Sequence, residues 1–465
     1  MDSMLEWSRA AWRRHLPNVP DIDAFVRELG DGTIHGLAHA SAIASPDKLA
    51  VRLGDESMTH GELDSMAGRF AASLGIREGD RVLLVAPVSL SWLGVYLGIL
   101  RAGGVAVLGN PAYTEAELEG IVTAAEPALV LREVGRPHAA EPEPWTERST
   151  PDSVALLAFT SGTTGKPKGV PLTHRNLLTS IRAAMAAWGW KRHDVLVHAL
   201  PLFHQHGLGG LHATLIAGSS LHLLPRFDPE ELVRAAEKAT VLFAVPTMYQ
   251  RLEGKAASNR LRLCISGSAP LNRAVADHAG KVLGRVPLVR YGATESGLDT
   301  SQVISDPPAD TVGIPLPGVE LRFGEDGEIQ LRGPQVASAF LDSDGWFRTG
   351  DIGRLDEATG HLVIDGRTKE MIITGGMKVY PREVEVALEA HPDVAEAAVA
   401  GVASERWGEQ VMAWVVMKPG ALFDSGKLIE HASALLAPYK RPKGIKPLES
   451  LPRNHVGKID RRGLR

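Results

Sequence analysis

The stretch that organises this chain reads TSGTTGKPKG over residues 160–169, and it follows the apolar run VALLAF at 154–159. A buried strand that leads into small, hydroxyl-bearing and basic residues lets the backbone approach an anion and aims amide, hydroxyl and ammonium donors at it. The spacing is not that of the P-loop, in which the second glycine is followed by Lys and then Ser or Thr. The stretch therefore predicts a cradle for a polyphosphate rather than an ordinary solvated loop.

Length and composition restrict the kind of protein. The 465 residues suffice for two or three packed units, and a formal net charge of −5 argues against nucleic acid as the main partner. The single cysteine, Cys264, excludes an intrachain disulfide and lies in an apolar run that predicts a core position. No secretory signal is visible, and residues 82–100 are better explained by a strand, a turn and a helix than by a membrane span. We expect a cytoplasmic protein without a membrane partner.

Short apolar runs alternate with helical patterns in the first part of the chain, which suits a mostly parallel sheet covered by helices. A capping box, in which Thr59 is followed by Glu62, predicts the start of a helix that continues to residue 74. Candidate strands lie at 48–52, 81–85, 105–108, 128–131, 154–159, 194–200, 241–245 and 261–265. The predicted fold class is α/β, with a large N-terminal domain of sheets covered by helices and a small C-terminal α+β lid.

A second motif, LVRYGATE, occupies residues 288–295. A carboxylate beside a polyphosphate needs a cation between the two, so Glu295 is a natural ligand for a magnesium ion. Thr294 can donate to a phosphate, and Tyr291 can stack on a purine. Farther along the chain, Asp351 can accept two ribose hydroxyls.

Together these stretches resemble the adenylate-forming superfamily, which comprises acyl-CoA synthetases, adenylation domains of peptide synthetases and luciferases. The resemblance rests on the phosphate cradle, on the Tyr-Gly-x-Thr-Glu motif about 130 residues later, and on the segments around Lys369 and Lys458. The x is Ala293, where methionine or leucine is usual. The resemblance implies a large domain over residues 1–368 and a mobile small domain over 369–465, with Lys369 as the hinge.

The resemblance also implies a role for each residue at a matching position. The residues implied to bind ATP are Thr160, Ser161, Gly162, Thr163, Thr164, Gly165, Lys166, Lys168, Gly267, Ser268, Ala269, Tyr291, Gly292, Asp351 and Arg367. Those implied to line the acyl pocket are His204, His206, Arg251, Ser266 and Arg290. Those implied to be catalytic are Lys458, Thr294 and Glu295, and those implied to serve the hinge and the CoA thiol are Lys369, Gly375 and Gly376. A zinc site at the two histidines is disfavoured, because no third ligand is spaced nearby.

The implied chemistry is an AMP-forming acid–thiol ligation with ATP, Mg²⁺ and coenzyme A. A carboxylate attacks the α-phosphorus of ATP and releases pyrophosphate, while Mg²⁺ at Glu295 and the Lys458 ammonium neutralise the phosphate charge. Rotation about Lys369 then withdraws Lys458, presents the face of Gly375, and lets a thiol displace AMP.

The prediction of which carboxylic acid is the substrate depends on Arg290. An arginine directly before the Tyr-Gly pair resembles the acyl pocket of malonyl-CoA synthetases, and a guanidinium holds a second carboxylate bidentately. We therefore expect malonate or methylmalonate, with Arg251 and His206 assisting. Arg290 could instead pair with Glu295 or Asp299 and leave the pocket to another short-chain, medium-chain or aromatic acid. An enzyme that loads a carrier protein and a silent nucleotide-binding protein also stay open.

Overall fold

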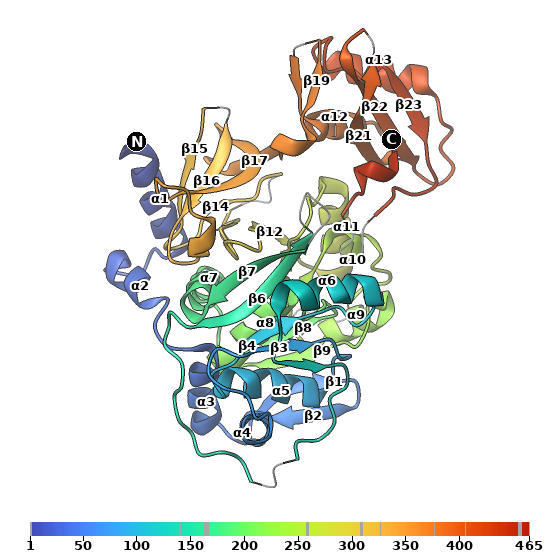
Figure 1. Ribbon diagram of the computed structural model, residues 1–465. Helices are drawn as coiled ribbons and strands as arrows, with labels where there is room; N and C mark the ends of the chain where they lie inside the picture. Colours follow the sequence, from blue (N-terminus) through green and yellow to red (C-terminus); the bar gives the residue numbers. More distant parts are fainter. Residues whose placement is uncertain are drawn as a thin grey trace. The chain divides into compact units, whose positions relative to one another are not determined.

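The computed structural model describes residues 2–138, 141–161, 167–256, 260–306, 310–325, 327–375, 377–404, 406–453 and 458–464. The chain divides into two compact units, which Figure 1 colours along the sequence. The first comprises Met1–Arg322 and Leu331–Phe347, and the second comprises Phe323–Gln330 and Arg348–Arg465. Lys369 falls inside the second unit by this division, so the domain boundary at residue 368 stays a prediction.

The largest sheet of the first unit has the strand order β14-β13-β12-β11-β10-β8-β9-β1-β2. Its central strands run parallel, and both of its edges are antiparallel. Strands β10 and β11 are buried along their whole length, as is usual where helices cover both faces of a parallel sheet. The strands are β1 (Leu49–Leu53), β2 (Glu56–Thr59), β8 (Val195–His198), β9 (Ser220–Leu223), β10 (Val241–Ala244), β11 (Leu263–Ser266), β12 (Leu288–Tyr291), β13 (Thr300–Ser301) and β14 (Ile314–Pro315).

The phosphate-cradle sequence belongs to a second sheet, of order β5-β3-β4-β6-β7. Its strands are β3 (Arg81–Leu84), β4 (Val105–Leu108), β5 (Leu129–Leu131), β6 (Val154–Ser161) and β7 (Pro167–Thr173). The first four are parallel, whereas β6 and β7 are antiparallel and pair from Val154 with Thr173 to Ser161 with Pro167. Strand β7 was not predicted. The cradle sequence therefore connects two paired strands rather than a strand and a helix.

Side-chain caps mark where many helices of the first unit begin. The predicted capping box is confirmed, because Thr59 and Glu62 bond each other's backbone N–H groups at 2.8 and 3.2 Å. The predicted strand, turn and helix over residues 82–100 are also confirmed as β3 and α5, and no helix among the described residues is long and apolar enough to cross a membrane. The helices are α1 (Asp2–His15), α2 (Ile22–Glu28), α3 (Ile34–Ala44), α4 (His60–Ser73), α5 (Leu90–Arg101), α6 (Glu115–Ala125), α7 (His174–Ala187), α8 (Gln205–Ala217), α9 (Pro229–Ala236), α10 (Pro246–Gln250) and α11 (Arg273–Leu283).

The C-terminal part of the chain contains the remaining two sheets, of order β15-β16-β17-β18 and β20-β19-β22-β21, with β23 parallel to β22. Its strands are β15 (Glu320–Phe323), β16 (Glu328–Arg332), β17 (Phe347–Leu355), β18 (Leu362–Arg367), β19 (Ile372–Thr374), β20 (Met377–Val379), β21 (Val394–Ser404), β22 (Gly408–Met417) and β23 (Gly444–Pro447). Helices α12 (Pro381–Glu389) and α13 (Ser425–Leu435) contribute Val384, Leu388 and Ala432 to a core shared with β21 and β22. Mixed α/β sheets with a smaller C-terminal α+β unit confirm the predicted fold class.

Candidate active site

Most of the predicted acyl-pocket residues lie where parallel strands of the large sheet end. Ser266 is the last residue of β11, and Arg290 is the last but one of β12. His204 and His206 lie at the start of α8, which follows β8. Because the carboxyl ends of parallel strands meet at one edge of a sheet, this edge gathers polar side chains from several elements.

Arg290 is buried in this edge, with 9% of its surface exposed. Its guanidinium lies against Gly267: a Cβ at that glycine would be only 2.3 Å from Arg290 Nε. Burial lowers the pKa of Arg290 to about 10, and the negative charge of Asp299 opposes this shift. The side chain therefore keeps its charge at neutral pH. Among the described residues, none forms a hydrogen bond or an ion pair with this guanidinium, and its Nε is buried without an acceptor.

His206 lies beside the same charge. Burial, followed by the charge of Arg290 and the nearby His198, holds the pKa of His206 well below its usual value, so the ring is neutral. Its Nδ1 lies 3.5 Å from the hydroxyl of Ser268, a residue held in the left-handed region at φ 72°. Its Nε2 and the hydroxyl of Ser266 are buried without a partner in the described part of the chain. Unpaired buried polar atoms cost free energy, so their clustering here indicates a place for a polar ligand.

The Tyr-Gly-Ala-Thr-Glu motif forms a tight loop after β12. A Cβ at Gly292 would lie 1.9 Å from the carbonyl oxygen of Gly297, so the turn needs glycine at that position. Asp299 lies beneath the loop with no exposed surface, and its carboxylate accepts a hydrogen bond from Ser296 Oγ at 2.5 Å. Burial raises the pKa of Asp299 to about 7, while the hydrogen bonds and Arg290 act in the opposite direction. No ion pair joins Arg290 to Asp299 in the part of the chain that the structure describes, but the charge of Asp299 acts on the pKa of Arg290. The alternative in which Arg290 pairs with a local acid therefore stays a prediction.

Glu295 and Thr294 are held in this loop by backbone contacts. The backbone N–H of Ala337 donates to the Glu295 carbonyl at 2.8 Å, and the side chain of Gln205 donates to the Thr294 carbonyl at 2.7 Å. Both side chains are half-buried, and neither forms a hydrogen bond with another described residue. A single carboxylate with hard oxygen donors fits Mg²⁺, which usually takes one or two carboxylates together with substrate phosphates.

The phosphate cradle is described at its two ends. Thr160 lies opposite Lys168 in the hairpin, and the Lys168 ammonium lies 4.2 Å from the ring centroid of Phe340. An aromatic face attracts an ammonium and fixes the direction of this lysine. The remaining predicted ligands of this stretch, Gly162, Thr163, Thr164, Gly165 and Lys166, lie outside the described residues.

Arg251 behaves differently from the other predicted acyl-pocket residues. It is exposed, it follows the end of α10, and its guanidinium lies 4.9 Å from the ring centroid of Phe227. The structure therefore brings His206, Ser266 and Arg290 together and leaves Arg251 on the surface.

The second unit carries the other predicted residues. Asp351 is buried and lies 2.9 Å from Arg367 Nε, opposite it in the pairing of β17 with β18. Lys369 is exposed in a 3-10 turn, η2 (Thr368–Glu370), and Lys458 is exposed just before Ile459. Gly375 has φ 57°, and its N–H donates to the Trp407 carbonyl at 2.8 Å. Gly376 is not among the described residues.

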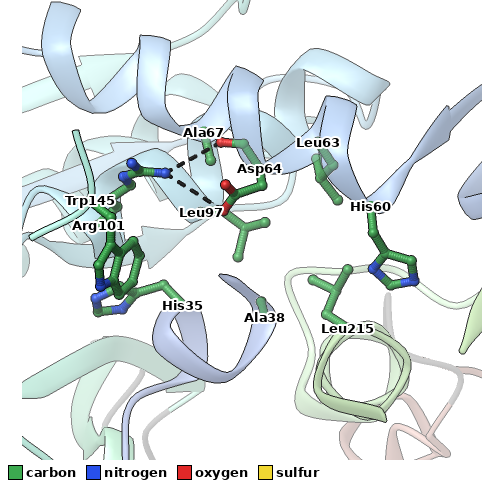
Figure 2. Close-up of a pocket in the computed structure, with 10 residues that line it drawn as sticks. All are labelled: His35, Ala38, His60, Leu63, Asp64, Ala67, Leu97, Arg101, Trp145 and Leu215. Atoms are coloured by element: carbon green, nitrogen blue, oxygen red, sulfur yellow. Dashed lines mark hydrogen bonds and ion pairs between the residues drawn. The ribbon is translucent and has the colours of Figure 1, made fainter. Parts of the chain in front are cut away.

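A separate cavity of about 10 Å³, room for about one water molecule, lies among α3, α4 and α5 (Figure 2). Arg101 reaches across it, with one guanidinium nitrogen 3.6 Å from Asp64 Oδ1 and another donating to the Glu143 carbonyl at 2.6 Å. Its guanidinium also lies 5.1 Å from the ring centroid of Trp145. The acid and the carbonyl bind the two terminal nitrogens of this arginine, whereas its Nε has no hydrogen-bond partner in the described part of the chain. The cavity is too small for a substrate.

Sequence reasoning missed four residues that shape the site: His198, Gln205, Asp299 as a buried acid, and Phe340. His198 ends β8, and its Nδ1 accepts from the Leu200 N–H at 3.1 Å, which places the ring proton on Nε2. One signal was present, since His198 follows the apolar run 195–197 and stands three residues before Pro201, where the Pro-Leu-Phe-His segment begins.

Comparison with known proteins identifies the family. The model of the AMP-binding enzyme family matches residues 39–147 and 130–341, and the model of the C-terminal domain of AMP-binding enzymes matches residues 383–458. The mitochondrial malonate–CoA ligase of Mus musculus is 31% identical over 571 aligned residues, which cover 99% of this chain and 95% of the relative.

Solved structures agree with this match. The crystal structure of ATP-bound MatB from Rhodopseudomonas palustris has a TM-score of 0.86 at 34% sequence identity and covers 93% of this chain and 98% of its own. The o-succinylbenzoate CoA synthetase MenE of Bacillus subtilis, in complex with its acyl-adenylate intermediate, has a TM-score of 0.81 at 27% identity. The match covers 92% of this chain and 97% of the MenE chain. The resemblance inferred from the sequence motifs is confirmed, and the chain belongs to the family of AMP-binding enzymes.

Proposed function

We propose that this chain is an AMP-forming acid–CoA ligase whose preferred acid is malonate or methylmalonate. The observation that carries the choice of acid is Arg290, a buried cation with no acceptor among the described residues, beside the unpaired polar atoms of Ser266 and His206. A guanidinium binds a carboxylate bidentately, and a buried charge without a partner is costly, so a second carboxylate of the substrate fits this position. The malonate–CoA ligase relative supports this choice.

In the first half-reaction, a carboxylate oxygen of the acid bonds to the α-phosphorus of ATP. The bond from that phosphorus to the bridging oxygen of the β-phosphate breaks, and pyrophosphate leaves. Arg290 holds the other carboxylate, while Thr294, Lys168 and the Lys458 ammonium stabilise the phosphate charge. No protein nucleophile is needed, because positioning and charge stabilisation do the work.

Glu295 would hold Mg²⁺ through its carboxylate. When bound, this ion neutralises phosphate charge and orients the phosphate oxygens. The ribose hydroxyls would bind the carboxylate of Asp351, which Arg367 Nε orients from a distance of 2.9 Å.

In the second half-reaction, the CoA sulfur bonds to the acyl carbonyl carbon. The bond from that carbon to the AMP oxygen breaks, AMP leaves, and the thiol proton passes to solvent. Rotation about Lys369 would replace Lys458 by the face of Gly375 before this step. Free CoA is the proposed acceptor, and a carrier protein is the alternative.

The test is acid-dependent release of pyrophosphate and AMP with Mg²⁺-ATP and free CoA, comparing malonate, methylmalonate, acetate, butyrate, octanoate and benzoate. We expect kcat/KM for malonate to exceed that for butyrate by about 10²- to 10⁴-fold, because a site built for a polar group rejects a substrate that lacks it. Preference for an apolar acid would leave the ligase activity standing and would remove Arg290 from acid recognition. Absence of CoA-dependent AMP release, with pyrophosphate formed, would favour a carrier protein.

A further inference from the structure

The chain that carries Lys458 is attached to the second unit on both of its sides. Before it, Arg453 donates to the carboxylate of Glu396 at 2.7 Å, and a β-bridge pairs Arg453 with Ile459. After it, Ile459 and Leu464 pack with buried residues of β21 and β22. These contacts tie the segment to the body of the unit and do not involve the hinge.

Arg461 makes a different set of contacts, because it reaches the predicted hinge. Its Nε donates to the Val399 carbonyl at 3.0 Å, and one terminal nitrogen lies 2.6 Å from the carboxylate of Glu385, which is 2% exposed. The other terminal nitrogen lies 2.9 Å from the carboxylate of Glu370. Glu370 is the last residue of η2 and directly follows Lys369.

The connection from the predicted hinge to Lys458 through the Glu370–Arg461 ion pair is therefore short. Glu370 is one residue from Lys369, and Arg461 is three residues from Lys458, a chain length that spans at most about 10 Å. A planar guanidinium shared between two carboxylates and a carbonyl has little freedom to turn. The hinge turn is also joined to the body of the unit through β19, because Ile372 packs in one core with Val399 and Thr374 pairs with Gly408 of β22. The ion pair adds a direct contact between the hinge turn and the Lys458 segment.

We propose that Arg461 is a positioning residue that joins the hinge turn and the Lys458 segment into one rigid body, so that rotation at the hinge is transmitted to the Lys458 ammonium. This inference rests on the proposed function, because it takes Lys458 as the lysine of the adenylation step. Misplacing a catalytic group by about 1 Å can cost about 10²-fold in rate, so a looser link slows adenylation. The thioester step does not use Lys458 and is not affected.

The test compares two matched variants, Glu370→Ala and Glu396→Ala. Each removes a partly exposed carboxylate that pairs with an arginine beside Lys458, but only Glu370 belongs to the hinge turn. We expect Glu370→Ala to lower kcat for malonate-dependent pyrophosphate release about tenfold and to change KM for ATP by less than about twofold. Thioester formation from supplied malonyl-adenylate should keep its rate, and Glu396→Ala should resemble the wild type in both assays.

Three more variants and a reference variant complete the test. Arg461→Gln should match Glu370→Ala, the double variant should be no slower than either, and Arg461→Lys should recover part of the rate. An equal loss in Glu396→Ala, or a loss in both half-reactions, would show general loosening of the unit and overturn the inference. Lys458→Ala serves as the reference: unchanged pyrophosphate release in that variant would overturn the proposed role of Lys458 itself, whatever Glu370→Ala does.

Discussion

Two buried arginines of the first unit, Arg101 and Arg290, are 6% and 9% exposed, yet their surroundings differ. Figure 2 shows the carboxylate of Asp64 and the ring of Trp145 beside Arg101. The Glu143 carbonyl accepts a hydrogen bond from the same guanidinium, whose Nε alone has no partner among the described residues. Arg290 has glycine against one side and, within the described residues, no acceptor at all. A buried charge is tolerated when its partners are supplied by the protein or by a ligand. The ionic partner of Arg101 therefore belongs to the fold, whereas the surroundings of Arg290 support its proposed role in binding the acid.

The largest expected effect comes from removing the charge of Arg290. In Arg290→Gln, we expect kcat/KM for malonate to fall about 10²- to 10³-fold, because a buried hydrogen-bonded charge pair is lost. For butyrate the value should stay within about threefold, and the melting temperature should not fall. Steady-state kinetics with both acids measure this. Arg251→Gln, which changes an exposed arginine near the same strands, is the control, and an equal loss for both acids would show that Arg290 does not select the acid.

A smaller effect is expected at Arg101, and it concerns the stability of the fold rather than the selectivity for the acid. In Arg101→Gln, the free energy of unfolding should fall by about 2–3 kcal/mol, because Asp64 keeps only His39 as a partner among the described residues and the part-buried Glu143 carbonyl contact loses its donor. Selectivity for malonate over butyrate should not change. Urea denaturation and the same kinetic assays measure the two properties. The control is Arg132→Gln, which removes an exposed ion pair with Glu115 and should leave the midpoint of urea denaturation unchanged. Altered acid selectivity in Arg101→Gln would break the distinction between the two arginines.

The smallest effect concerns Asp299, the acid that faces Arg290 without touching it. Burial raises the pKa of Asp299 to about 7, so the side chain is neutral below that pH and becomes negative above it. Its negative charge then offsets part of the Arg290 charge, and KM for malonate should rise about threefold between pH 6.5 and 8.5. Asp299→Asn should remove this rise, and KM for butyrate should not show it. If KM for malonate rises equally in the wild type and in Asp299→Asn, a titrating group other than Asp299 causes the rise.

The fold was largely predictable because most strands coincide with apolar runs. The run at 105–108 is β4, and the run at 241–245 differs from β10 by one residue. Strand β7 was missed because Pro167 and Pro171 disfavour a strand, and only pairing with β6 shows that the segment is extended. Sequence patterns report local preference, whereas this strand depends on its partner.

The candidate site was predictable where one segment contains the whole signal, as in the loop that carries Thr294 and Glu295. It was not predictable where two distant segments meet. Gln205 supports Thr294 from a position 89 residues earlier, and Phe340 lies under Lys168 from 172 residues later. Neither residue stands out in the sequence, because glutamine and phenylalanine carry no chemistry of their own for this reaction.

The burial of Cys264 makes the protein suitable for fluorescence labelling. The thiol is 1% exposed, and burial raises its pKa to about 12, so a maleimide dye has almost no thiolate to react with. Leu422, on the second unit, is 89% exposed, so Leu422→Cys would supply one reactive thiol without removal of the native cysteine. A dye at that position would test whether the second unit rotates during turnover, as proposed.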